Sequence, residues 1–190
     1  MKTKTLLIRY DEIGLKGRNR RHFENQLVSN IRYVLRDIKN IKIDKIHGRI
    51  LGRVDFTDAE KCTSRLTQIP GIASISIGNS MEPDFDKMAE LGVSLIHEKL
   101  QTQGELKFCV RTRRSNKGFP FTSREVDFEV GSRIMGILSS KGLSVDINRA
   151  EFIFEIEIGP QETIVFDNRV PGLRGLPVGS SGQVLSLLSG

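Results

Sequence analysis

The sequence has few of the residues that build metal sites or disulfide frameworks. Its two cysteines, Cys62 and Cys109, lie far apart and form no CxxC pair, and none of its three histidines lies at metal-ligand spacing. We therefore expect free thiols in a reducing cytoplasm and no metal site. Apolar runs extend over only a few residues, and the N-terminal residues become polar too soon for a secretory signal. We expect a cytoplasmic protein with no membrane partner.

Complete enzymatic sites are absent as well. The chain has no GxxxxGKS/T phosphate loop, no nucleophile–base triad, and no carboxylate pair placed by more than the spacing of a helix surface. With 190 residues, of which 38% are hydrophobic and 27% charged, it has the composition of a soluble globular protein and a length that suits two domains.

Positive charge is present in excess, and it is unevenly distributed. Residues 1–75 hold 16 lysines and arginines against 8 acidic residues, whereas residues 76–168 hold 11 against 15. This acidic second segment nevertheless contains a stretch without any acidic residue, 107–124, which carries six cations: Lys107, Arg111, Arg113, Arg114, Lys117 and Arg124. Charge focused in this way indicates a binding surface, because a merely solvated surface mixes the two signs.

Aromatic residues are interleaved with these cations. Cations bind phosphate and aromatic faces stack on unpaired bases, so the stretch predicts a loop that grips a nucleic-acid strand. Turn-forming residues between Ser115 and Pro120 place part of it on a loop. The alternative is a solvated basic hairpin above core phenylalanines. Phe119 or Phe121 would stack on a terminal base in the first interpretation and pack under the loop in the second.

A second basic patch lies near the N-terminus, in the loop 12–19 and the helix expected after it. Its cations are Lys16, Arg18, Arg20 and Arg21. Helix N-termini and flexible backbone amides attract phosphate, which suggests a second contact with nucleic acid, but on composition alone a solvated loop is the favoured interpretation. Cys109 shares its expected strand face with Arg111 and Arg113, whose charge would lower the pKa of the thiol; a buried or idle cysteine is nevertheless the favoured interpretation.

The pattern of apolar residues predicts two α/β domains. Residues 1–78 are expected to form the ferredoxin-like order βαββαβ, with Asn19 as the N-cap of its first helix and a capping box at 57–60 before its second. Residues 79–168 are expected to open on a helix with Pro83 in its first turn, followed by a strand, a helix capped by Thr122 and Glu125, and three strands. Residues 169–190 are expected to be a linker and, at 183–188, the first strand of a further domain.

Three stretches, in order, resemble the motifs of one family, the tRNA 4-thiouridine synthetases. Ile8–Glu24 (IRYDEIGLKGRNRRHFE) is similar to the opening motif, with Asp11 in place of the usual glycine. Arg111–Ile134 (RTRRSNKGFPFTSREVDFEVGSRI) resembles the signature of the THUMP RNA-binding domain. Val170–Gly190 (VPGLRGLPVGSSGQVLSLLSG) resembles the bridge into an ATP-pyrophosphatase domain, with Ser189 and Gly190 as the first two residues of its SGGxDS loop.

The resemblance implies a fold and a function. It implies a ferredoxin-like domain, a THUMP domain that holds the acceptor stem and 3′ end of tRNA, and a pyrophosphatase domain that adenylates uridine 8 before a cysteine persulfide supplies sulfur. Neither Cys62 nor Cys109 matches the catalytic cysteine of that family. The chain would thus be a fragment or one half of a split enzyme, inactive alone, with ATP and Mg²⁺ belonging to the missing domain.

The resemblance also implies partners. These are tRNA, the pyrophosphatase domain or subunit, a cysteine desulfurase as sulfur donor, and a second copy in a homodimer; some members of the family also serve thiamine biosynthesis. The RNA-binding residues would be Arg111, Arg113, Arg114, Lys117, Phe119, Phe121 and Arg124, with Lys16, Arg18, Arg20 and Arg21 as a second set. Two alternatives remain, a stand-alone RNA-binding or regulatory module and a sulfur relay through Cys109.

Overall fold

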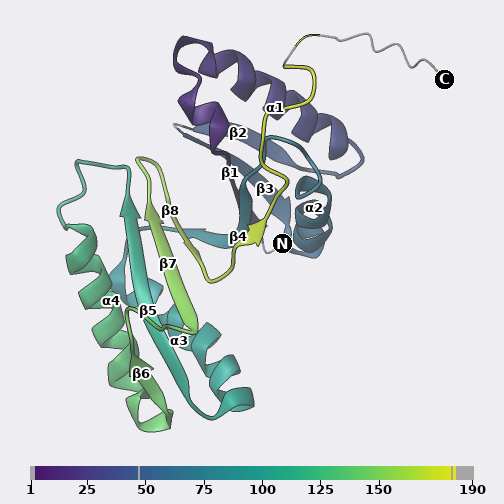
Figure 1. Cartoon of the computed structure of the whole chain (residues 1–190). Coiled ribbons are helices and arrows are strands. Elements are labelled where there is room, and N and C mark those ends of the chain that lie inside the picture. Colours follow the sequence, from purple (N-terminus) through teal and green to yellow (C-terminus); the bar gives the residue numbers. More distant parts are fainter. Residues whose placement is uncertain (1–2, 47, 181, 183–190) are drawn as a thin grey trace. The chain divides into compact units, whose positions relative to one another are not determined.

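The computed structural model describes residues 3–46, 48–180 and 182, and their elements are shown in Figure 1. The described residues form two compact units. The first contains the residues up to Ile77 together with those from Arg169 onward, and the second contains Gly78–Asn168. The chain thus leaves the first unit, completes the second, and returns to the first. Each unit is described by itself below.

The first unit has the βαββαβ order that the sequence predicts. Its elements are β1 (Thr3–Arg9), α1 (Arg20–Val34), β2 (Lys42–Ile46), β3 (Arg49–Asp55), α2 (Ala59–Leu66) and β4 (Ser74–Met81). The strand order is β2-β3-β1-β4, and β1 and β3 are antiparallel. Leu6 and Ile8 alternate along β1 and join one core cluster with Leu27 of α1 and Leu66 of α2, so both helices pack on the same face of the sheet. This is the ferredoxin-like fold.

Two of the expected helix caps in this unit are wrong. Asn19 precedes α1 but its side chain makes no capping hydrogen bond. The expected capping box has Thr57 at the N-cap, but the structure has Asp58 there, and its side chain makes no capping hydrogen bond either. Both residues have helical backbone angles because a short 3₁₀ turn precedes each helix. An N-cap side chain reaches the amides of the first turn from an extended backbone, so a preceding 3₁₀ turn removes that geometry. The capping box expected at 57–60 is therefore not formed.

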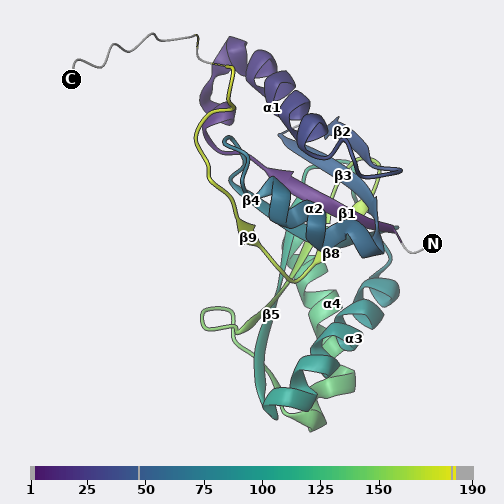
Figure 2. The same cartoon turned by 90° about the vertical axis from the view of Figure 1, so that its right-hand side faces the viewer.

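The described part of the expected linker belongs to the first unit. Val170 and Pro171 form β9, which pairs with Ile75 and Ser74 of β4. Beyond β9 the Arg174 amide donates to the Ile72 carbonyl at 2.8 Å. Residues 169–180, here called the strap, then continue beside α1, where Asn30 donates to the Val178 carbonyl at 3.1 Å (Figure 2). The strand expected at 183–188 and the residues Ser189 and Gly190 lie outside the described residues.

The second unit is a five-stranded sheet with two helices. Its elements after β4 are α3 (Phe85–Gln103), β5 (Leu106–Arg114), α4 (Ser123–Leu138), β6 (Leu143–Val145), β7 (Phe152–Ile158) and β8 (Thr163–Phe166). The strand order is β4-β8-β7-β5-β6, with β5 parallel to both of its neighbours. Phe108 of β5 lies in one core cluster with Ile96 of α3 and Val130 of α4, so the helices cover one face of this sheet (Figure 1).

The N-termini of the helices in this unit agree better with the positions predicted from the sequence. Thr122 accepts a hydrogen bond from the Glu125 amide while the Glu125 carboxylate accepts one from the Thr122 amide, which confirms the predicted capping box. The N-cap of α3 is Asp84, whose carboxylate accepts from the amides of Asp86 and Lys87 at 2.9 Å. Pro83 therefore lies just outside the helix whose first turn it was expected to occupy.

Candidate nucleic-acid interface

The loop between β5 and α4, residues 115–122, is held at both ends. The Ser115 amide donates to the Ile158 carbonyl at 3.0 Å, which ties the beginning of the loop to β7. Within the loop the Gly118 amide donates to Asn116 Oδ1 at 2.9 Å. The capping box at Thr122 fixes its end. The loop thus presents its side chains from an ordered backbone, as a preorganised binding surface requires.

Arg114 holds this loop from inside. Its Nη1 donates to the carbonyls of Phe119 and Phe121 at 2.8 and 2.7 Å, and the side chain is half-buried. A guanidinium that satisfies two loop carbonyls has fewer donors left for phosphate. The structure therefore places Arg114 as a scaffold of the loop, a role that its position in the basic stretch does not reveal.

Three other cations of the basic stretch are free for a ligand. Arg113, Lys117 and Arg124 are exposed, and among the described residues none of them makes an ion pair or a side-chain hydrogen bond. Arg111 is exposed too, and donates one bond from Nη2 to the Ile147 carbonyl at 3.2 Å. Such unpaired cations on a unit whose net charge is negative mark the part of its surface that attracts an anion.

The aromatic residues of the loop pack against each other. Phe119 is half-buried against the core, and Phe121 lies edge-on to Phe85 with ring centroids 5.0 Å apart. Phe121 remains 40% exposed. Of the two phenylalanines of the loop, Phe119 is therefore the one that packs under it. Phe108, on β5, is fully buried. The most exposed phenylalanine of the described residues lies outside the basic stretch: Phe128 on α4, at 71%.

The second basic patch is only partly available. Arg20 Nε donates to Glu24 Oε1 at 2.8 Å and Arg20 Nη2 donates to the Tyr10 hydroxyl at 3.0 Å. The Tyr10 hydroxyl donates to the same carboxylate, and Lys45 Nζ lies 3.5 Å from it. Arg20 is thus a structural residue, whereas Arg18 and Arg21 are exposed and unpaired within the described part of the chain. Lys16 lies over the ring of Phe23, 5.5 Å from its centroid.

This network shifts the pKa values of its members. Burial, followed by the bond to Glu24, raises the pKa of Tyr10 to about 12. Burial also acts to raise the pKa of Glu24, but the hydrogen bonds from Tyr10 and Arg20 outweigh it, so the pKa of that carboxyl is lowered. Glu24 is therefore a carboxylate that stabilises the start of α1, and it leaves Tyr10 neutral.

Cys109 does not have the properties of a reactive thiol. Its side chain is 2% exposed. Burial raises the pKa of this thiol and outweighs the opposite effect of Arg111, the reverse of the depression that the strand pattern suggested. The pKa of the Cys62 thiol is raised by burial as well. No group of His, Cys, Asp and Glu within the described ranges could hold a metal ion, and no described helix is long and apolar enough to cross a membrane.

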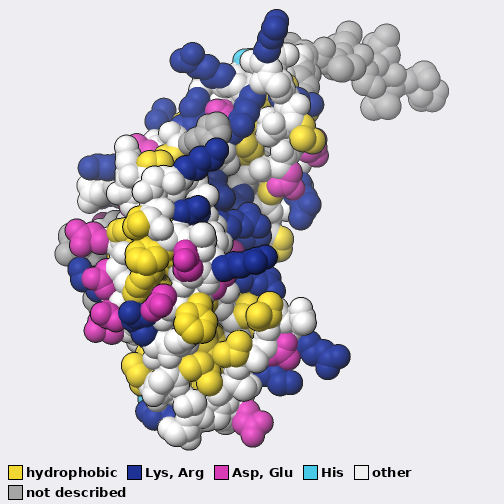
Figure 3. Space-filling model, turned by 90° about the vertical axis from the view of Figure 1, so that its left-hand side faces the viewer, with side chains coloured by type: hydrophobic (Ala, Val, Ile, Leu, Met, Phe, Trp, Pro, Cys, Tyr) yellow, Lys and Arg dark blue, Asp and Glu magenta, His cyan; other side chains and the backbone are white. Residues whose placement is uncertain are grey.

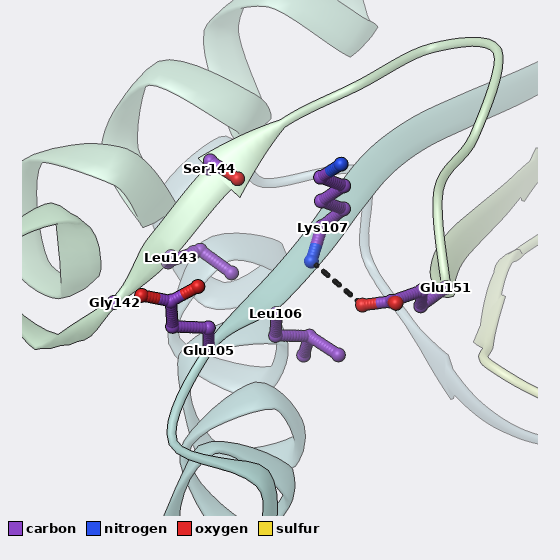
Figure 4. A pocket seen from close by; sticks show the side chains of 7 residues that line it. All are labelled: Glu105, Leu106, Lys107, Gly142, Leu143, Ser144 and Glu151. Carbon is purple, nitrogen blue, oxygen red and sulfur yellow. Dashed lines mark hydrogen bonds between the residues drawn. The ribbon is translucent and has the colours of Figure 1, made fainter.

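An open pocket lies at the beginning of β5, away from the basic loop (Figure 4). Its volume is about 500 Å³, and Glu151 at its edge accepts a hydrogen bond from the Lys107 amide at 3.2 Å. Its charged side chains are Glu105, Lys107 and Glu151. Seven residues of strand, about 23 Å, separate Lys107 from Arg114. The pocket therefore contributes nothing to the cationic surface, and its carboxylates would repel phosphate.

These observations define a two-domain protein in which a ferredoxin-like domain is followed by an α/β domain with a cationic loop. Comparison with known protein families identifies both parts. Residues 5–76 match the ThiI ferredoxin-like domain, and residues 82–166 match the THUMP domain.

Two curated relatives agree with this assignment. A probable tRNA sulfurtransferase of Alkaliphilus oremlandii is 36% identical over 186 residues, which are 97% of this chain and 47% of that protein. A probable tRNA sulfurtransferase of Brevibacillus brevis is 37% identical over 185 residues, which are 97% of this chain and 45% of that protein. The chain spans about half the length of the curated relatives it matches. Over its ferredoxin-like and THUMP domains, the chain is similar to these probable tRNA sulfurtransferases.

Solved structures show the same pair of domains. The protein PH1313 of Pyrococcus horikoshii superposes with a TM-score of 0.82 at 29% identity, covering 93% of this chain and 58% of that one. A 4-thiouridine synthetase solved in complex with RNA and ATP superposes with a TM-score of 0.74 at 31% identity, covering 95% of this chain and 45% of that one. TrmN of Thermus thermophilus, at 15% identity and a TM-score of 0.51, shares the fold alone.

Proposed function

We propose that this chain is the tRNA-binding part of a tRNA sulfurtransferase that makes 4-thiouridine at position 8. The observation that carries the proposal is a set of exposed cations in a net-acidic unit, none of them ion-paired within the described residues: Arg113 near the end of β5, Lys117 on the ordered loop, and Arg124 in the first turn of α4. The similarity to a 4-thiouridine synthetase that was solved with RNA supports it. The loop belongs to the residues that match the THUMP domain.

The mechanism that follows is positional. Cations of the loop neutralise backbone phosphates, which orients an RNA without reading its sequence. Selectivity for the acceptor stem and 3′ end then comes from shape, 2′-hydroxyl groups and unpaired nucleotides. Holding the end of the stem fixes the distance from that end to the uridine that is modified. Arg18 and Arg21, with Lys16, provide a second set of phosphate contacts from the first unit.

The chemistry of the reaction belongs to the part of the relatives that this chain does not span. We place ATP and Mg²⁺ there as substrate and metal, together with the cysteine that carries sulfur from a cysteine desulfurase. We also place the protein in the cytoplasm, where tRNA is found. We propose that it assembles as a homodimer. For some members of the family, sulfur transfer extends to thiamine biosynthesis. A sulfur relay through Cys109 is disfavoured by its burial and raised pKa.

The test of this proposal is the salt dependence of tRNA binding. Arg113→Ala with Lys117→Ala should weaken binding and lower the slope of log K against log salt by about 0.7–0.9 for each phosphate that the variant no longer binds. Lys141→Ala is the matched control for the removal of one charge, because this exposed lysine follows the far end of α4, about 24 Å from the loop. An unchanged slope in the double variant would remove these residues from the interface.

The same titrations should use tRNA with and without its 3′-terminal nucleotides. If the loop holds an unpaired end, removal of those nucleotides weakens binding to the native chain and reduces the effect of the double variant. Equal affinity for both RNAs would favour a stand-alone module that binds RNA without regard to its 3′ end.

A further inference from the structure

Phe128 occupies an unusual place on α4. The residues that α4 buries are Val126, Val130, Ile134 and Leu138, all on one side of the helix. Phe128 falls on the outer side, where its ring is 71% exposed. Figure 3 shows hydrophobic side chains gathered on this face of the second unit. The outer face of a surface helix is mostly polar, and exposed apolar side chains that gather beside a cationic loop are typical of an interaction site.

The ring has no structural use within its own unit. Phe85, Phe119 and Phe121 contact one another edge-on or tilted, with centroids 5.0 and 5.8 Å apart. Phe128 is in no core cluster, and it contacts no ring or cation among the described residues. Most of its surface is therefore accessible to a ligand.

Arg124 lies one turn before Phe128. Residues four apart on a helix are neighbours, with Cβ atoms about 5–6 Å apart. Arg124 is exposed and has no ion pair in the described part of the chain, in contrast to Arg133 of the same helix, which donates to Asp86 at 2.7 Å. The nearby carboxylate Glu125 is engaged in the capping box, where the bond from the Thr122 amide lowers its pKa. The cation therefore remains free beside the ring.

We propose that Phe128 and Arg124 form a binding subsite for one unpaired nucleotide, the base stacking on the Phe128 ring and its phosphate meeting the Arg124 guanidinium. The proposal rests on the proposed function and adds Phe128 to it. An exposed aromatic ring with a cation one helical turn away is a combination by which proteins bind single-stranded RNA, because every base has a π-face and every nucleotide has a phosphate. The capping box holds the first turn of α4, so the pair is presented from a rigid element.

The charge of the surroundings selects this occupant. Arg113 near the end of β5 and Lys117 on the loop that leads into α4 are unpaired within the described residues, and residues 107–124 contain no acidic side chain. An apolar protein surface would have to bury these cations without partners, which is costly, whereas an RNA strand supplies a phosphate for each. A duplex would not use the ring, because its base faces are already stacked.

Two substitutions separate the roles of the pair. Phe128→Leu keeps an apolar side chain of high helix propensity and removes the aromatic face, so binding of the tRNA should weaken by about 5- to 150-fold with an unchanged salt slope. Arg124→Gln should weaken binding and lower the salt slope by about 0.7, the value for a phosphate of a single strand. Ile137→Ala is the matched control, an exposed apolar residue (53%) in the last turn of the same helix.

A direct probe is a tRNA acceptor minihelix with 2-aminopurine at one of its 3′-terminal nucleotides. Stacking on the ring should quench the fluorescence of the probe at one position in the native chain and in Ile137→Ala, and the quenching should disappear in Phe128→Leu. Native affinity and quenching in Phe128→Leu would overturn the subsite, even if Arg113→Ala with Lys117→Ala still weakens binding and so preserves the proposed function.

A change in self-association of Phe128→Leu without any change in RNA binding, seen by sedimentation, would also overturn it and assign the ring to a contact between copies. If the native chain binds no tRNA at all, the proposed function fails before the subsite is tested.

Discussion

Single residues of the basic stretch divide into those that build the loop and those that face a ligand. Arg114 and Arg113 are neighbours in the sequence, yet only Arg114 points to the helix side of the sheet, where it reaches the loop carbonyls. Alternation along β5 predicts which residues share a face. It does not predict Arg114 as a scaffold, because its acceptors, the Phe119 and Phe121 carbonyls, are placed by loop angles that the residue types do not specify.

This division can be tested at Arg114 itself. Arg114→Lys keeps the charge but loses the planar fork that serves two carbonyls, so we expect it to lower the free energy of unfolding by about 1–3 kcal/mol, nearly as much as Arg114→Ala. Urea denaturation of the whole chain measures this effect. Arg113→Lys is the control and should leave stability unchanged. Native stability of Arg114→Lys together with a lower salt slope for Arg114→Ala would make Arg114 a phosphate contact instead.

At the scale of elements, the sequence predicts most where a local rule is sufficient. The order βαββαβ follows from apolar periodicity, and the capping box at Thr122 follows from four adjacent residues. Phe128 could have been identified from the same periodicity, since it falls between the inward positions Val126 and Val130. The position of the strap could not be predicted from the sequence. Its strand β9 pairs with a strand about a hundred residues earlier in the chain, and a glycine- and proline-rich segment has no residue pattern that indicates its pairing partner.

Gly172 makes the strap a testable element. A Cβ atom at this position would lie 2.4 Å from the Ile72 carbonyl oxygen, a backbone atom that cannot move without disturbing β4. We expect Gly172→Ala to lower the free energy of unfolding by about 1–3 kcal/mol and to speed hydrogen exchange at the Gly71 and Arg174 amides, which bond across this contact.

Gly14→Ala is the control for this substitution. It lies in the same unit, and a Cβ atom there would meet nothing within 4 Å. Unchanged stability and unchanged protection of both amides in Gly172→Ala would show that the strap is not held as the structure has it.

On the scale of the whole molecule, charge is divided between the units. Residues 1–75 carry a net charge of +8 and residues 76–168 a net charge of −4, so the first unit attracts polyanions broadly while the second does so only at its basic stretch. Counting residues does not show which of these cations already have a hydrogen-bond or ion-pair partner within the protein. Arg20 is bound to Glu24 and Tyr10, whereas Arg18 and Arg21 are exposed and unpaired within the described residues.

Substitution of Arg18 and Arg21 tests whether these two residues contact RNA directly. Arg18→Ala with Arg21→Ala should lower the salt slope for tRNA by about 0.9 for each duplex phosphate that these residues contact, because the counterions released by those contacts are no longer released. Lys39→Ala with Lys42→Ala removes the same charge from exposed positions of the same unit. If the two double variants lower the slope equally, Arg18 and Arg21 act only through the general field of the first unit. A larger effect at Arg18 and Arg21 identifies them as direct contacts, because each phosphate contact releases condensed counterions and a distant charge does not.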